Sequence, residues 1–137
     1  NGGTLLTSAN GVTWTAPTSL APTINLKSVT YGVNVDPATK TITGYLFVAI
    51  GDNGVLVTSA DGVTWTQSTI GATNNLAAVT FGREFIAVGD SGSIFTSSNG
   101  TVWTAQASNT TSNLKAIGHS TANYSAVGAT GTNLSAI

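Results

Sequence analysis

Short runs rich in Val, Ile, Thr and aromatic residues alternate along this chain with Gly, Asn and Asp. Such runs are typical of β-strands, and the residues between them are typical of turns. No run of ten residues shows the i, i+3, i+4 spacing of apolar positions that an amphipathic helix requires. The pattern therefore predicts an all-β protein.

One stretch of the chain shows the predicted element order most clearly. Its strands are expected at about 26–31, 45–50, 55–59 and 64–68. Asn53-Gly54 is a strong two-residue hairpin signal, because the turn between two antiparallel strands needs positive φ at both residues. Ser91-Gly92 and Thr130-Gly131 occupy the same place in later stretches.

The whole pattern is an internal repeat. A block that begins with an aromatic residue and passes through Gly to a second Gly recurs at 47–54, 85–92 and 124–131. A block that begins with Leu precedes it at 26–32, 76–82 and, more weakly, at 114–118. Equivalent repeat positions fall near residues 1, 52, 90 and 129. We expect one repeat domain over 1–137, with an exposed loop inserted at about 33–44.

A third block is the most recognisable. It reads Ser-Ala-Asn-Gly-Val-Thr-Trp at 8–14, Ser-Ala-Asp-Gly-Val-Thr-Trp at 59–65 and Ser-Ser-Asn-Gly-Thr-Val-Trp at 97–103. Four antiparallel strands in roughly 40 residues make one blade of a β-propeller. The chain would hold about thirteen strands, beginning with a pair at about 4–8 and 13–16 and ending with a strand that stops at residue 137. These make about three and a quarter blades, where a propeller typically has four to eight.

The Ser-x-Asp/Asn-Gly-x-Thr-Trp block resembles the Asp-box, or BNR, repeat of sialidase-like and photosystem-assembly-factor-like β-propellers. The resemblance implies that the block is a turn between the third and fourth strands of each blade. It also implies that these turns lie away from the central axis of the propeller. The motif positions are Ser8, Asn10, Gly11, Trp14, Ser59, Asp61, Gly62, Trp65, Ser97, Asn99, Gly100 and Trp103.

The residue types of this motif suit a structural turn. The side chains of Asn10, Asp61 and Asn99 can accept hydrogen bonds from backbone N–H groups two residues on, and the following Gly can take positive φ. Each Trp would begin the outer strand, and burial of its ring would stabilise the packing within or between blades. We expect all three Trp side chains to be buried and equivalent. A ligand site made of these turns is the less favoured alternative.

Composition narrows the possible partners. Only 7% of the residues are charged, and the formal net charge is −1. Four scattered cations cannot form the basic footprint that nucleic acids or anionic membranes need. The longest apolar run, 45–50, is far shorter than the roughly 20 residues of a spanning helix. The abundance of Thr, Ser and Asn favours a location outside the cell or on its surface.

Catalytic candidates are few. Gly89-Asp90-Ser91-Gly92 matches the nucleophile segment of trypsin-like proteases, but its place in the repeat indicates a hairpin turn. His119 is the sole histidine, and nothing in the sequence places it with Ser91 and an acid, as a triad would require.

Other activities also lack their residues. Sialidases bind the substrate carboxylate with three Arg, and this chain has only Arg83. Glu84 beside it is expected at the surface. The chain has no Cys, and its acids are dispersed. We therefore expect no catalytic residue, no metal and no cofactor.

These observations favour a non-enzymatic β-propeller module for protein or glycan binding or for assembly, outside the cell or at its surface. Two alternatives stay open. One is a self-associating structural subunit of an extracellular array, and the other is a fragment of a larger glycoside hydrolase. The chain begins at Asn1 and contains no Met, so we expect a processed product or part of a longer chain. Its blades would be completed by that longer chain or by a second copy, head to tail, in a six-bladed ring.

Overall fold

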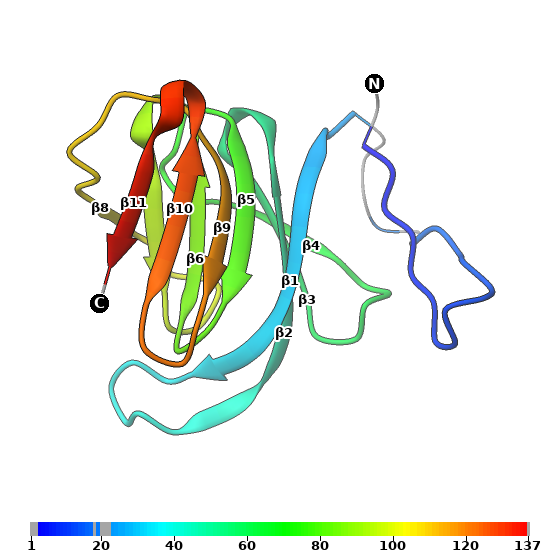
Figure 1. Cartoon of the computed structure of the whole chain (residues 1–137). Helices are drawn as coiled ribbons and strands as arrows, with labels where there is room; N and C mark the ends of the chain where they lie inside the picture. The colour runs from blue at the N-terminus through cyan, green and yellow to red at the C-terminus, as the bar shows by residue number, and fades with distance from the viewer. Residues whose placement is uncertain (1–2, 18, 20–22, 137) are drawn as a thin grey trace.

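The computed structural model describes residues 3–17, 19 and 23–136, and it is all-β, as predicted (Figure 1). Eleven strands form three antiparallel sheets within these residues. Sheet 1 contains β1 (Leu26–Val35), β2 (Ile42–Gly51), β3 (Val55–Ser59) and β4 (Thr66–Thr69). Sheet 2 contains β5 (Leu76–Phe81), β6 (Phe85–Gly89), β7 (Ile94–Ser97) and β8 (Thr104–Gln106). Sheet 3 contains β9 (Leu114–His119), β10 (Tyr124–Gly128) and β11 (Asn133–Ala136).

Each sheet is a meander, in which consecutive strands pair with one another. The hairpin signals are confirmed, because a tight turn joins the second and third strands of every sheet. In the first turn Asn53 has φ 56° and Gly54 has φ 66°, and the N–H of Val55 donates to the carbonyl of Asp52. The turns are η1 (Asp52–Gly54), η2 (Asp90–Gly92) and η3 (Ala129–Gly131).

The loop expected at 33–44 is shorter than predicted. Residues 33–35 continue β1 and residues 42–44 continue β2, so the insertion is an extension of the first hairpin. Only 36–41 form its turn, closed by the N–H of Lys40 donating to the carbonyl of Asp36. Val33 lies opposite Tyr45 across the extended pair. Figure 1 shows this hairpin reaching beyond the ends of the other two sheets.

The three sheets pack face to face, with sheet 2 in the middle (Figure 1). One apolar core fills the joint between sheets 1 and 2, where Ile50, Leu76 and Phe85 are fully buried. A second core fills the joint between sheets 2 and 3, around Val88 and Leu114. The fold is therefore a linear stack in which each joint has its own core.

The segment before sheet 1 differs from expectation. Strands were expected at 4–8 and 13–16, but an isolated pair, Thr7 opposite Thr15, is the only bridge there among the described residues. Leu5 packs against sheet 1 beside Trp65, and the backbone N–H of Trp65 donates to Oγ of Ser19. The expected repeat start near residue 1 and the expected strand end at residue 137 lie outside the described residues.

The bridge has the same register as the sheets. Thr58 lies opposite Thr66 in sheet 1, and Thr96 lies opposite Thr104 in sheet 2. These pairs occupy the place in the repeat that Thr7 and Thr15 occupy near the start of the chain. The first segment thus begins the same strand-turn-strand arrangement without extending it into a sheet.

Candidate functional site

Three turns, at 8–14, 59–65 and 97–103, carry the repeated Ser and Trp and are called the Ser–Trp turns below. The second joins β3 to β4, and the third joins β7 to β8. In the second turn Oδ1 of Asp61 accepts from the N–H groups of Val63 and Thr64, at 2.8 and 2.7 Å. The Ser59 hydroxyl donates to Oδ1 of Asp61 at 2.9 Å and accepts from the N–H of Gly62 at 2.8 Å.

The other two turns reproduce this network with a neutral side chain. Oδ1 of Asn10 accepts from Val12 and Thr13, both at 2.9 Å. Oδ1 of Asn99 accepts from the corresponding pair of N–H groups at 3.0 and 2.8 Å. The glycine of each turn has φ of 74° or 75°, which favours Gly over any residue with a Cβ. The Ser, Asp/Asn and Gly positions thus share one backbone conformation.

The Trp residues share a hydrogen bond but not an environment. Each indole N–H donates to the carbonyl of the Gly in its own turn, at 3.0 to 3.2 Å. Trp65 is 5% exposed, Trp103 is partly buried, and Trp14 is 56% exposed. The expectation that all three are buried is wrong for Trp14, because the described structure places no complete sheet around its turn.

Charge distinguishes Asp61 from its two counterparts. The N–H groups of Thr64 and Val63 donate to its carboxylate and lower its pKa from 3.8 to about 2. The Ser59 hydroxyl acts in the same direction. Asp61 therefore stays ionised at neutral pH, and its charge is used in holding the turn.

Asparagine residues that the sequence analysis missed connect the sheets. The N–H of Asn53 in sheet 1 donates to Oδ1 of Asn75, which precedes β5, at 3.0 Å. The N–H of Ser91 in sheet 2 donates to Oδ1 of Asn113, which precedes β9, at 2.9 Å. The same hydrogen bond thus recurs at both joints of the stack.

The backbone carbonyls of the same asparagines accept hydrogen bonds from residues of their own sheets. The carbonyl of Asn75 accepts from the N–H of Asp90 at 2.9 Å, and that of Asn113 accepts from Ala129 at 2.8 Å. Asn25 makes the corresponding bond to Asp52 at 3.0 Å. The signal was present in the sequence, since Asn precedes Leu at the start of every copy of the Leu block.

The acids in the hairpin turns also have structural partners. Lys27 lies 3.6 Å from Oδ1 of Asp52, and Lys115 of sheet 3 lies 3.4 Å from Oδ1 of Asp90 in sheet 2. Both lysines are largely exposed, so each pair contributes at most about 1 kcal/mol.

The structure does not bring the catalytic candidates together. Ser91 is the second residue of turn η2 with φ 56°, as the hairpin interpretation requires. His119 ends β9, where Nδ1 lies 3.1 Å from the Thr80 hydroxyl. Among the described residues no three His, Cys, Asp or Glu side chains are grouped so that they could hold a metal ion.

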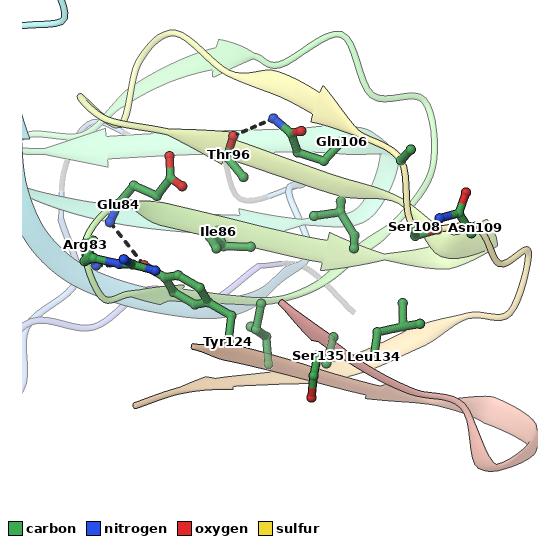
Figure 2. Close-up of a pocket in the computed structure, with 14 residues that line it drawn as sticks. Arg83, Glu84, Ile86, Thr96, Gln106, Ser108, Asn109, Tyr124, Leu134 and Ser135 are labelled. Carbon is green, nitrogen blue, oxygen red and sulfur yellow. Dashed lines mark hydrogen bonds between the residues drawn. The ribbon is translucent and has the colours of Figure 1, made fainter. Parts of the chain in front are cut away.

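A cavity of about 530 Å³ opens between sheets 2 and 3 (Figure 2). Apolar side chains from both sheets line its walls, and Arg83 and Glu84 stand at one end. The hydroxyl of Tyr124 accepts from the backbone N–H groups of Arg83 and Glu84, at 2.7 and 3.3 Å. Glu84, expected merely at the surface, therefore lies at the rim of a cavity. The apolar part of the wall is formed by Ile86, Ile94, Ile117, Ala126 and Leu134, and the polar part by Thr96, Gln106, Ser108, Asn109 and Ser135.

A second cavity, of about 610 Å³, separates the first Ser–Trp turn from the outer face of sheet 1. Trp14 and Leu6 line one side of it, and Val29, Phe47 and Trp65 line the other. The face continues along the extended hairpin. Tyr31 and Tyr45 stand there with their rings nearly parallel at 5.8 Å, 49% and 57% exposed.

No family model and no curated protein matches the chain. Among the described residues no helix has the length and apolar character to cross a membrane.

Proposed function

We propose that this chain is a non-enzymatic module for binding or assembly, outside the cell or on its surface, and that its sheets are blades of an Asp-box β-propeller. Its blades would be completed by further blades of a longer chain or by a second copy. The observation that carries the binding function is the exposed aromatic surface of sheet 1. Tyr31, Tyr45 and Val29 are each about half exposed on one face.

This surface suits a ligand that is recognised by stacking and hydrogen bonds. Tyrosine combines an apolar ring with a polar hydroxyl and is enriched at binding interfaces for that reason. The cross-strand neighbours of the two tyrosines, Val33 and Phe47, are uncharged. A glycan or a neutral protein surface fits this chemistry better than a charged ligand does.

The alternative of a hydrolase finds less support. Asp52 and Asp90 are paired with lysines, and Asp61 is bound by backbone N–H groups within its turn. Among the described residues that line the cavity between sheets 2 and 3, Glu84 is the one carboxylate, whereas retaining and inverting glycosidases require a facing pair.

A glycan array with the purified chain, followed by titration of the best oligosaccharide, tests the binding function. Tyr31→Ala and Tyr45→Ala should each weaken binding at least ten-fold, while the control Val102→Ala, at another exposed apolar position, should leave it unchanged. Binding that is equal in all variants would exclude this surface. Turnover of a fluorogenic glycoside or peptide that is lost in Glu84→Gln or Ser91→Ala would overturn the non-enzymatic assignment.

A further inference from the structure

The cavity between sheets 2 and 3 has a filled counterpart between sheets 1 and 2. There Trp103 packs against the core, with its ring 6.4 Å from that of Phe85. Gly100 of the same turn lies against Leu46, Val48 and Phe85. A complete Ser–Trp turn therefore fills the first joint.

The repeat alignment places equivalent residues around the open cavity. Aligning 47–54 with 85–92 and 124–131 makes Glu84 and Ile86 the counterparts of Leu46 and Val48. The same alignment makes Tyr124 the counterpart of Phe85. Glu84, Ile86 and Tyr124 all line the cavity (Figure 2), so it occupies the place in the repeat that the third Ser–Trp turn fills in the first joint.

The neighbouring strand edge is open as well. β3 pairs with β4, and β7 pairs with β8, but β11 pairs only with β10 among the described residues. Ser135 of β11 is the counterpart of Thr58 and Thr96, which pair with the threonine that follows each Trp. An unpaired edge of this kind accepts an added strand readily.

The first Ser–Trp turn has the matching features. Trp14 is preformed for insertion, because its indole N–H already donates to the carbonyl of Gly11 while the residue is 56% exposed. Residues 3–17 contain no charged side chain, so burial of this segment would remove no charge of its own from water. Thr15 is held by a single bridge to Thr7, whose two backbone bonds could be replaced by equivalent bonds to another strand.

We propose that Trp14 of a second copy of this chain occupies the cavity between sheets 2 and 3, with its Thr15 opposite Ser135 of β11. This proposal rests on the assembly part of the proposed function and names its partner. The occupant would supply the indole and the fourth strand that the first two sheets already have. Copies joined in this way would associate head to tail.

Cross-linking tests the register directly, because the chain has no Cys. A residue pair that exchanges both backbone bonds has Cα atoms about 5.5 Å apart, within the range of a disulfide. Thr15→Cys and Ser135→Cys variants of different mass are mixed and oxidised. A heterodimer should form at least ten-fold faster than in a mixture of Val102→Cys with Ser135→Cys, and adding Trp14→Ala to the first variant should remove that advantage.

Two outcomes would overturn the proposal. One is a heterodimer that forms no faster than in the control mixture. The other is a chain with both substitutions that closes only an intramolecular disulfide. Oligosaccharide binding through Tyr31 and Tyr45 is measured separately, so failure of the cross-link leaves the binding function standing, and loss of binding leaves the cross-link interpretable.

Discussion

Trp65 and Trp14 occupy the same position of the repeat and make the same hydrogen bond, yet their surroundings differ. Trp65 packs against Ala49 and Val57 and has its ring 6.1 Å from Phe47. Trp14 is more than half exposed. The turn itself is therefore independent of burial, and the contribution of the indole to stability depends on the sheet that surrounds it.

Replacing each of these Trp residues with Ala should separate the stability due to burial of the indole ring from that due to the hydrogen bond within the turn. Trp65→Ala should lower the free energy of unfolding by about 3–5 kcal/mol, as truncation of a large buried aromatic residue does. Trp14→Ala should cost much less, because little of its ring is removed from water. Urea denaturation in dilute solution measures both, and equal losses would contradict the assigned burial of Trp65.

The lowered pKa of Asp61 leads to a pH dependence with a definite sign. The native pKa of about 2 lies below the ordinary value of 3.8, so the ionised form is favoured by folding. The resulting stability is complete above the ordinary pKa and is lost as the pH falls through about 2. Asn10 and Asn99 hold the same turn without a charge.

Asp61→Asn should therefore keep the turn and reduce the acid sensitivity. Thermal unfolding of the variant and the unchanged chain at neutral pH and near pH 2 measures the difference. The loss on acidification should be smaller in the variant, although Asp36, whose pKa is also lowered by backbone N–H bonds, contributes in both proteins. An unchanged loss would show that the Asp61 carboxylate does not stabilise the native state.

At the scale of elements, alternation of residue types predicts the strands and hairpin turns of these sheets well. Asn53-Gly54 specifies its turn by conformation alone. The sequence did not indicate the extension of the first hairpin, because Asp36-Pro37 and Lys40 are typical of a loop. The pairing of Val33 with Tyr45 is visible only in the structure. The Asn joints were missed for a related reason, since Asn75 appears in the sequence as a turn residue.

Gly82 and Gly118 differ in how closely other atoms approach them. A Cβ on Gly82 would lie 2.7 Å from the hydroxyl of Tyr124, which is too close for an ordinary contact. A Cβ on Gly118 would meet nothing within 4 Å. Gly82 is the seventh residue of its Leu block, and Gly118 is the fifth residue of another, where it takes the place of Thr80.

Gly82→Ala should therefore lower the melting temperature by several degrees, through a loss of about 1–3 kcal/mol from overpacking. Gly118→Ala should leave it nearly unchanged or raise it slightly, because Ala restricts the unfolded chain. Differential scanning calorimetry compares the two. A larger effect at Gly118 would contradict the packing of sheet 3 on sheet 2.

At the scale of the whole molecule, the two ends of the stack differ in chemistry. Val48 and Leu56 lie on the face of sheet 1 that packs against sheet 2. Ile86 and Ile94 hold the same repeat positions on the face of sheet 2 that packs against sheet 3. The free face of sheet 3 carries exposed Ser125 and Asn133 there, joined by a hydrogen bond of 3.3 Å.

A polar outer face is a feature of the end units of repeat stacks. The opposite end, at sheet 1, presents the tyrosine pair and an apolar cleft. Contacts with other molecules are therefore expected at sheet 1 and at the joint between sheets 2 and 3, more than on the free face of sheet 3.

Equivalent contacts join successive sheets, and amide hydrogen exchange tests this at three matched residues. Asn53, Ser91 and Thr130 share a φ of 56° in their hairpin turns. Asn75 and Asn113 accept from the first two N–H groups, whereas no side chain accepts from Thr130 in the part of the chain that is described.

After correction for intrinsic rates, NMR should show Asn53 and Ser91 exchanging roughly five-fold or more slowly than Thr130, as a hydrogen bond of about 1 kcal/mol requires. Asn75→Ala should abolish the protection of Asn53 and leave that of Ser91. Equal exchange at all three residues, or protection of Asn53 that survives Asn75→Ala, would contradict the account.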